Sequence, residues 1–215
     1  MKKKNGKSGP ARKTGQPHQV RIIGGQWKRT PLSVADTVGL RPTPDRVRET
    51  VFNWLNHLLG GEWRSVHCLD LFAGTGVLGF ETASRGAASV TMVESAQQPY
   101  LELQAAKARL NASQVNLMRG DAERVAVSFA QQQEKFNLIF LDPPYRLDLL
   151  EKILLACVPL ISPEGYLYAE SDMPLIGNDH VDAHPWLEPW EIVRADRAGN
   201  VFYHLLRLKG DDLKA

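Results

Sequence analysis

Residues 66–80, with the sequence VHCLDLFAGTGVLGF, decide the fold. The stretch begins with a short apolar run from Val66 to Phe72, which is typical of a buried strand. The segment Gly74-Thr75-Gly76 predicts a tight turn, and the residues from Val77 to Arg85 predict a helix closed by Gly86. A strand, a glycine turn and a helix in this order are the repeating unit of open parallel sheets.

The alternation of strands and helices continues outward from this unit. Strands are predicted at 89–94, 116–118, 136–141 and 165–170, and helices at 44–59, 97–111, 122–132 and 147–158. Two β-rich runs, 190–195 and 201–208, flank the turn Ala198-Gly199-Asn200 and predict a terminal hairpin. The pattern predicts an α/β fold with a doubly wound, mostly parallel, Rossmann-like sheet covered on both faces, to which the hairpin adds an antiparallel edge.

Charge divides the chain of 215 residues unevenly. Residues 1–35 hold nine basic residues and no acid, whereas the rest of the chain holds 17 basic and 24 acidic residues. A basic arm on an acidic body favours a polyanionic partner such as RNA, although a solvated tail without a partner is the alternative. We expect a disordered basic tail at 1–17, a small β-extension at 18–40 that starts with a strand from Val20 to Ile23, and the main domain at 41–215.

Composition excludes several protein classes. Cys68 and Cys157 are too few for a disulfide framework or a thiolate metal site, and both stand in apolar contexts that predict buried thiols. No apolar run is long enough for a membrane span, and no apolar segment follows the N-terminal basic residues as it would in a secretory signal. We therefore expect a cytoplasmic protein with no metal and no membrane partner.

The glycine turn also carries a cofactor motif. Gly74, Gly76 and Gly79 match G-x-G-x-x-G, and Glu94 follows at the spacing of a ribose-binding acid. A nicotinamide cofactor would use the same geometry. However, a carboxylate at Asp70 would repel a pyrophosphate and suit an ammonium or sulfonium group. S-adenosylmethionine carries both cations together with a ribose, and it is the predicted cofactor.

The tetrapeptide Asp142-Pro143-Pro144-Tyr145 follows the predicted strand 136–141. The two prolines remove two backbone donors and stiffen the chain, so that nearby carbonyls stay free to accept. The lone pair of an exocyclic base amine is delocalised into the ring. A carboxylate and a carbonyl that accept its two hydrogens would free that lone pair, and an aromatic ring could stack on the base. This pattern predicts amine methylation.

These motifs resemble a known family. The segment 70–76, DLFAGTG, together with Asp142-Pro143-Pro144-Tyr145 is similar to class I S-adenosylmethionine-dependent amino-methyltransferases. The stretches 21–28, RIIGGQWK, and 41–49, RPTPDRVRE, resemble the RsmD family, and the resemblance covers about residues 18–209. It implies a seven-stranded sheet whose last strand is antiparallel, and an N-terminal β-extension that helps to hold RNA.

The resemblance further implies the reaction and its partner. The family methylates N2 of guanine 966 in bacterial 16S rRNA, on the 30S subunit or a late assembly intermediate, by direct transfer without a metal or covalent intermediate. A monomer is expected. The implied catalytic residues are Asp142, Pro143 and Tyr145. The implied cofactor-binding residues are Asp70, Phe72, Ala73, Gly74, Thr75, Gly76, Glu94, Asp121 and Ala122. The residues expected to meet RNA are Arg21, Lys28, Arg29, Arg41, Thr43 and Arg46.

Three other functions stay open at this point. A DNA adenine or cytosine amino-methyltransferase uses the same tetrapeptide but usually carries a separate target-recognition domain, for which 215 residues leave little room. A small-molecule or protein-glutamine methyltransferase would share the fold without a use for the basic arm. A non-catalytic ribosome-assembly protein would explain the arm and leave the Asp142–Tyr145 motif unexplained.

Overall fold

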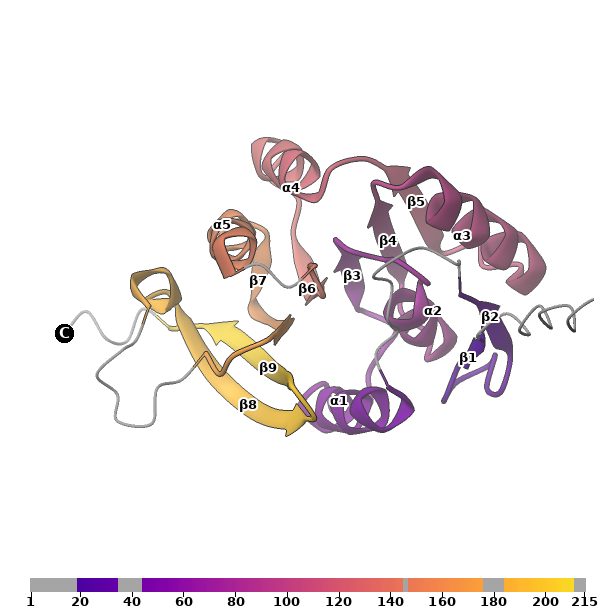
Figure 1. The fold of residues 1–215 in the computed structure, drawn as a ribbon, viewed down its shortest axis with the longest axis horizontal. Coiled ribbons are helices and arrows are strands. Elements are labelled where there is room, and N and C mark those ends of the chain that lie inside the picture. The colour runs from indigo at the N-terminus through magenta and orange to yellow at the C-terminus, as the bar shows by residue number, and fades with distance from the viewer. Residues whose placement is uncertain (1–18, 35–43, 145–146, 176–183, 211–215) are drawn as a thin grey trace, which may run out of the picture.

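A computed structural model describes residues 19–34, 44–144, 147–175 and 184–210. Within these ranges, seven strands form one sheet in the spatial order β5-β4-β3-β6-β7-β9-β8 (Figure 1). In chain order they are β3 (His67–Asp70), β4 (Ser89–Glu94), β5 (Val115–Arg119), β6 (Phe136–Leu141), β7 (Ile161–Ser171), β8 (Trp190–Ala198) and β9 (Val201–Leu208). The predicted doubly wound α/β sheet is confirmed.

The order of the strands determines where a ligand can bind. From β3 the chain runs outward through β4 to β5, and then returns to the other side of β3 to form β6 and β7. Neighbours from β5 to β7 are parallel, whereas β9 lies antiparallel between β7 and β8. The loops that follow β3 and β6 therefore diverge at a topological switch point, the place where open α/β sheets bind ligands.

Helices cover both faces of the sheet. They are α1 (Asp45–Leu58), α2 (Val77–Ser84), α3 (Gln97–Leu110), α4 (Ala122–Gln131), α5 (Leu147–Cys157) and the short 3-10 helix η1 (Pro185–Leu187). Helices α1, α2 and α3 pack on one face, and α4 and α5 pack on the other (Figure 1). Helix α1 shows why: its apolar residues Val47, Val51 and Leu55 are buried, and Trp54 and Leu58 pack against the same core.

The N-terminal segment is a two-stranded antiparallel hairpin of β1 (Gln19–Arg21) and β2 (Pro31–Ser33). Its apolar residues Val20, Ile22 and Leu32 belong to the same buried cluster as α1 and α2. The hairpin therefore packs directly against the main sheet domain. The strand expected from Val20 to Ile23 ends at Arg21. The Ile22 amide still bonds within the hairpin, to the Thr30 carbonyl, whereas the Ile23 and Gly24 amides bond to Glu81 of α2. The tail at 1–17 lies outside the described residues.

The two cysteines lie in separate cores, with Cys68 on the α2 side of the sheet and Cys157 on the α5 side. Both are buried free thiols, as their apolar contexts predict. Burial raises the pKa of each thiol, so neither is a reactive thiolate. In the part of the chain that the structure describes, no helix has the length and apolarity needed to cross a membrane.

Candidate active site

The loops after β3, β4 and β5 are joined by hydrogen bonds at the carboxyl edge of the sheet. The Ala73 amide donates to the Val93 carbonyl at 2.9 Å, and the Gly120 amide donates to the Glu94 carbonyl at 3.1 Å. On the other side of β3, Asp70 is paired in register with Phe140, two residues before Asp142. The segments that carry the predicted cofactor residues and the Asp142 motif therefore meet at one edge.

Each glycine of the fingerprint has its own structural role. Gly76 begins α2 in the left-handed region, with φ of 74°, and a Cβ there would lie 2.4 Å from a methyl group of Leu103. At Gly79, a Cβ would lie 2.5 Å from the Met92 methyl group, so this glycine lets α2 approach β4 closely. Gly74 also has a positive φ, and its amide donates to Glu94 Oε2. A side chain at Gly79 would therefore move α2 away from the sheet, and one at Gly76 would disturb the packing of α2 against α3.

Asp70 is a buried carboxyl group with unused acceptor capacity. It is 2% exposed, and its Oδ2 atom has no hydrogen-bond partner among the described residues. Burial raises the pKa of Asp70 from 3.8 to about 7; the amides of Phe72 and Gly79 oppose the rise, and the charge of Glu94 adds to it. A buried acceptor without a partner is costly, and a cationic donor at this edge would satisfy it.

Glu94 connects the glycine turn to the loop that leads into α3. Its Oε2 atom accepts from the Gly74 amide at 2.9 Å, and its Oε1 atom accepts from the Ala96 amide at 2.7 Å. The side chain remains partly exposed at the edge of the sheet. A carboxylate has about four lone-pair sites, so these two amides leave capacity for ribose hydroxyl groups.

Asp121 and Ala122, which the family resemblance implies as cofactor-binding residues, lie where β5 leads into α4. Asp121 is the N-cap of α4, and its side chain accepts from the Arg124 amide at 3.0 Å. Ala122 is buried in the α4–α5 core. Asp121 also lines a hollow of about 370 Å³ beside α4. Of the remaining cofactor residues, Phe72 is partly buried, and Ala73 and Thr75 are buried in the turn.

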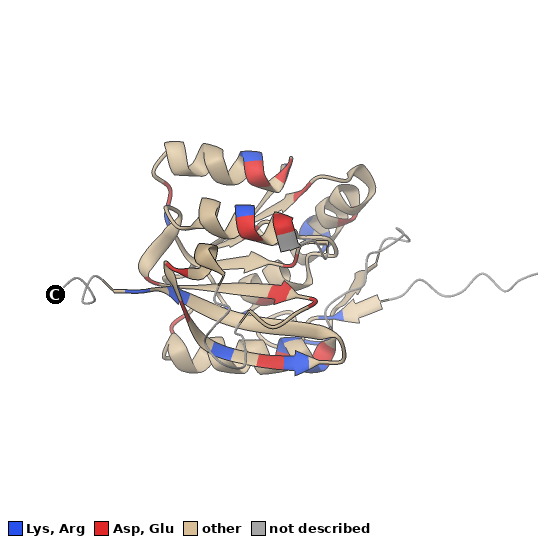
Figure 2. Ribbon diagram, turned by 60° about the vertical axis from the view of Figure 1, so that its left-hand side comes forward, with Lys and Arg blue, Asp and Glu red and all other residues tan. Residues whose placement is uncertain are grey.

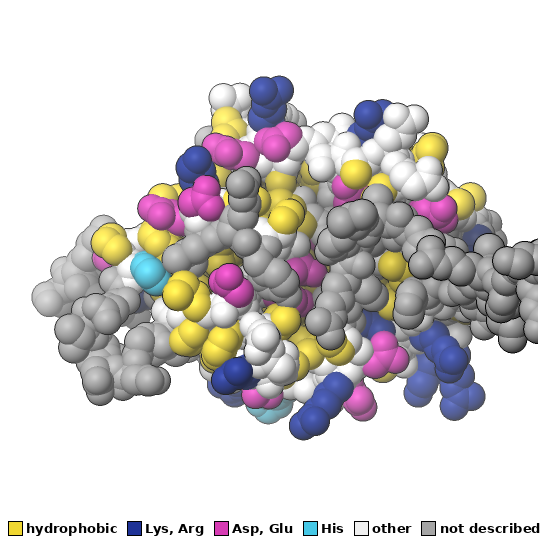
Figure 3. All heavy atoms as spheres, in the orientation of Figure 1, with side chains coloured by type: hydrophobic (Ala, Val, Ile, Leu, Met, Phe, Trp, Pro, Cys, Tyr) yellow, Lys and Arg dark blue, Asp and Glu magenta, His cyan; other side chains and the backbone are white. Residues whose placement is uncertain are grey.

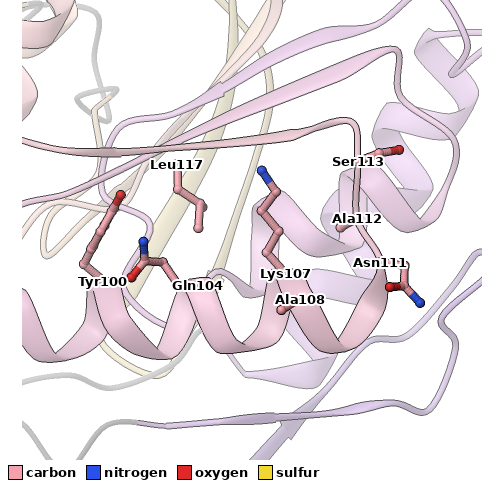
Figure 4. Close-up of a pocket in the computed structure, with 8 residues that line it drawn as sticks. All are labelled: Tyr100, Gln104, Lys107, Ala108, Asn111, Ala112, Ser113 and Leu117. Atoms are coloured by element: carbon pink, nitrogen blue, oxygen red, sulfur yellow. The ribbon is translucent and has the colours of Figure 1, made fainter.

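A larger hollow of about 670 Å³ lies between α3 and β5. Tyr100, Gln104 and Lys107 point from α3 toward Leu117 of β5 (Figure 4). None of the predicted site residues lines this hollow. Its walls also lack the convergent carboxylates of the sheet edge, so the candidate active site is the edge and not this hollow.

Asp142 directly follows β6 and is half-buried, whereas Pro143 is buried and Pro144 is exposed. Asp142 lies close enough to the buried Tyr168 for its negative charge to raise the pKa of that phenol. Tyr145 lies outside the described residues. The edge therefore presents an acceptor carboxylate beside the predicted cofactor residues, as the predicted amine methylation would require.

The residues expected to meet RNA are exposed where they are described. Arg21, Lys28 and Arg29 lie on the β1–β2 hairpin, and Arg46 lies in the first turn of α1. Lys and Arg side chains stand out along the lower margin of the molecule in Figure 3, where Figure 1 places α1 and the hairpin. Figure 2 shows that acidic residues lie between these basic residues, and that β8 carries acidic residues as well. The surface formed by α1 and the hairpin is therefore mixed in charge. Arg41 and Thr43 lie outside the described residues.

Sequence reasoning missed the attachment of this hairpin to α2. Glu81 is fully buried; its Oε2 atom accepts from the Ile23 amide at 2.6 Å, and its Oε1 atom accepts from the Gly24 amide at 2.7 Å and from Arg85 Nη2 at 2.9 Å. Arg48, also fully buried, lies 3.9 Å from Glu81 and donates to the Arg21 carbonyl. The signal in the sequence was a single charged residue, Glu81, within the otherwise uncharged segment 77–84.

Two glycines make the close approach of the hairpin possible. The Gln26 amide donates to the Ser84 carbonyl at 2.8 Å, and Ser84 Oγ donates to the Gly24 carbonyl at 2.6 Å. A Cβ on Gly25, whose φ is 73°, would lie 1.9 Å from the Ser84 carbonyl oxygen. Gly24 and Gly25 therefore form a contact surface for the last turn of α2.

Comparison with known proteins identifies the family. The family model described as conserved hypothetical protein 95 matches residues 20–207. The ribosomal RNA small subunit methyltransferase D of Escherichia coli (strain K12) is 40% identical over 190 residues, which cover 87% of this chain and 89% of the relative. This chain belongs to the RsmD family. It is a methyltransferase, as the two motifs predict.

Solved structures support the fold of this RsmD-family chain. The Escherichia coli protein yhhF superimposes with a TM-score of 0.72 at 34% identity, covering 89% of this chain and 99% of that chain. The T. thermophilus 16S rRNA N2 G1207 methyltransferase, solved with AdoMet and guanosine, superimposes with a TM-score of 0.59 at 20% identity over 89% of this chain and 49% of that chain. The second likeness concerns the fold, which is that of S-adenosylmethionine-dependent methyltransferases.

Proposed function

We propose that this chain methylates the exocyclic N2 of a guanine in 16S rRNA, with guanine 966 as the target, on the 30S subunit or a late assembly intermediate. S-adenosylmethionine is the proposed methyl donor. The observation that carries the proposal is the position of Asp142 at the switch point, directly after β6 and next to the strand that ends in Asp70, in a chain 40% identical to a ribosomal RNA small subunit methyltransferase D.

The residues at the edge fit this cofactor. Asp70 offers a buried carboxyl oxygen without a partner, which suits the ammonium of a methionine moiety. Glu94, on the far side of the glycine turn, keeps lone pairs for ribose hydroxyl groups. The segment from Phe72 to Gly76 would enclose the methionine part, and Asp121 with Ala122 would lie beside the adenine. When bound, the cofactor supplies an electrophilic methyl group on a sulfonium sulfur.

Asp142 and the Pro143 carbonyl would act on the guanine. Each would accept one hydrogen of the 2-amino group, which turns the nitrogen toward tetrahedral geometry and frees its lone pair. Tyr145 would stack on the extruded base. Asp142 does not need a raised basicity, because the nitrogen becomes acidic once it carries the new methyl group, and its proton can then leave through the hydrogen bond to the carboxylate.

Substitution of Asp142 tests this role. Asp142→Ala is expected to lower turnover by roughly 10²-fold or more, the effect of removing one preorganised group at a reacting centre. Cofactor affinity should change by no more than a few-fold, because Asp142 meets the base and not the methionine. Asp148→Ala, which removes an exposed carboxylate from α5, is the matched control. Near-normal turnover of Asp142→Ala would overturn the mechanism.

The substrate is tested by tritium transfer from labelled cofactor. We expect incorporation into 30S particles and late assembly intermediates, with the label at N2 of a guanine. Naked 16S rRNA and double-stranded DNA are the comparison substrates. Preferential labelling of DNA would instead support the DNA amino-methyltransferase, and binding to particles without any transfer would support an assembly protein.

A further inference from the structure

Glu170 lies beside Asp142 on the neighbouring strand. In the parallel pair of β6 and β7, Leu141 is paired with Ala169, so the next position on each chain is Asp142 and Glu170. Side chains alternate along a strand, and Phe140 and Tyr168 contact each other on the α1 face with ring centroids 5.8 Å apart. By this alternation, Glu170 lies on the same face of the sheet as Tyr168, and Asp142 lies on the same face as Phe140. Both carboxylates therefore belong to the α1 face.

The Glu170 carboxylate is buried and held in place. Glu170 is 3% exposed, and its Oε1 atom accepts from the Tyr168 hydroxyl at 2.8 Å. Burial raises the pKa of Tyr168 well above its usual value, and the charges of Glu170 and Asp142 raise it further. The phenol therefore stays protonated and keeps donating. On the other side, Glu170 is paired with Tyr203 of β9, whose ring lies 5.6 Å from that of Trp54 on α1.

The edge of guanine explains what a second acceptor could do here. Beside the 2-amino group, guanine carries the N1–H donor on the same edge. If Asp142 and the Pro143 carbonyl take the amine hydrogens, a base enclosed in the site still has a donor to satisfy. A buried donor without a partner is costly, so the site needs an acceptor next to Asp142.

We infer that Glu170 is a specificity-determining residue that accepts the N1–H of the target guanine. This inference rests on the proposed function and extends it to the choice of base. Guanine presents a donor at N1, whereas adenine and 2,6-diaminopurine present a lone pair there, which the carboxylate repels. Sites that hydrogen-bond a substrate donor reject analogues without it far more strongly than apolar pockets reject a missing methylene.

The test uses reconstituted 30S particles with guanine or 2,6-diaminopurine at the nucleotide that the wild-type protein methylates. Both bases carry a 2-amino group, and they differ at N1 and at position 6. The wild-type protein is expected to methylate the guanine particle at least about tenfold faster. Glu170→Gln should reduce this preference about tenfold or more, because a carboxamide can donate to the diaminopurine N1.

Two controls separate specificity from folding. Glu191→Gln makes the same change at a half-exposed carboxylate on β8 and should leave the preference unchanged. Cofactor binding by Glu170→Gln, measured by calorimetry, should match the wild type. If Glu170→Gln binds cofactor and keeps the wild-type preference, the inference is wrong.

The wild-type protein provides a measurement that is independent of any variant. Equal rates on guanine and diaminopurine particles would also overturn the role of Glu170, because nothing would then be reading N1. An absence of transfer to guanine particles is a different result, since it would count against the proposed function itself.

Discussion

Two carboxylates accept hydrogen bonds from backbone amides near the two ends of α2, and they differ in how much acceptor capacity remains for a ligand. Near the first turn, Glu94 accepts from the Gly74 and Ala96 amides and stays partly exposed. Near the last turn, Glu81 accepts from two hairpin amides and from Arg85, and it is fully buried. The acceptor capacity of Glu81 is used within the protein, whereas Glu94 keeps room for another donor.

The comparison separates a structural carboxylate from a functional one. Both residues are acidic side chains that join a loop to the same helix. Burial and saturation assign Glu81 to the attachment of the hairpin, since any ligand would have to displace bonds already made. Partial exposure and spare lone pairs leave Glu94, together with the neighbouring Asp70, available for the proposed ligand binding. Six variants test this separation.

The largest effect is expected from Glu81→Ala. The substitution removes the acceptor of the Arg85 guanidinium group and of two hairpin amides, and it removes the buried negative charge that lies 3.9 Å from Arg48; breaking a buried ion pair in this way costs about 3–5 kcal/mol. Urea unfolding measures the loss. Cofactor affinity of the folded fraction should remain within a few-fold of wild type, because Glu81 does not touch the glycine turn.

A matched variant shows whether burial is the reason. Glu191→Ala breaks an ion pair of 2.7 Å with Arg207, but both side chains are about half exposed. Exposed pairs are worth only about 0–1 kcal/mol, so this variant should unfold almost like the wild type. Equal losses for the two variants would contradict the structural role assigned to Glu81.

Most of the fold was predictable because its periodic patterns are local. The strands at 89–94 and 136–141 were predicted with the observed bounds, and the start of α3 was predicted at the observed residue. Strand β2 was not predicted from its own residues, because three residues carry no period, and β7 begins at Ile161 instead of 165 because of an irregular register with β6. Such features depend on tertiary pairing and not on local pattern.

The next largest effect is a pH dependence at Asp70. Its pKa is raised to about 7 in the folded protein, so between about pH 4 and pH 7 the folded state binds more protons than the unfolded state. The free energy of unfolding should therefore fall as the pH rises through this window, on the order of 4 kcal/mol in all by the linkage of pKa to stability. Asp70→Asn has no charge to bury and should lack this contribution.

The difference in unfolding free energy between the wild type and Asp70→Asn isolates the contribution of the Asp70 carboxyl group. Urea unfolding of both proteins at pH 5, 6, 7 and 8, without cofactor, should show the variant gaining on the wild type as the pH rises. The same variant should bind S-adenosylmethionine more weakly, because an amide cannot pair with an ammonium as a carboxylate does. Parallel pH curves for the two proteins would show that Asp70 is not the buried acid described above.

The candidate site was predictable in its motifs and not in its buried partners. Asp70, Gly74, Gly76 and Glu94 follow from spacing along one strand–turn–helix unit, and the structure joins them. The sequence did not single out Glu170, because its place beside Asp142 depends on the pairing of β6 with β7, two strands that are distant in the chain. Single-chain spacing holds no such information.

A smaller effect is expected from Glu94→Ala. It removes the predicted ribose acceptor and should weaken S-adenosylmethionine binding by about 1–3 kcal/mol, the range for a charge-assisted hydrogen bond. Because Glu94 is partly exposed, its loss should destabilise the protein far less than Glu81→Ala does. Calorimetry gives the affinity. Unchanged affinity would remove Glu94 from the site, and tight NAD binding would favour a dehydrogenase instead.

The smallest effect per residue is expected on the exposed side of the hairpin that Glu81 holds. Arg21, Lys28 and Arg29 are exposed, and the Arg48 bond to Arg21 uses the carbonyl, so truncating these three side chains leaves the attachment intact. If they meet phosphates, the triple alanine variant should flatten the salt dependence of 30S methylation by about 0.7–0.9 in slope for each lost contact.

Deletion of 1–17 removes six basic residues and should flatten the salt dependence of 30S methylation by less per charge. Cofactor binding should be unchanged in both, since no cofactor residue lies on the hairpin or before it. Methylation across a salt series compares the two variants with the full chain. If all three proteins share one activity and one salt slope, the hairpin does not grip RNA, and its buried attachment to α2 stabilises the fold alone.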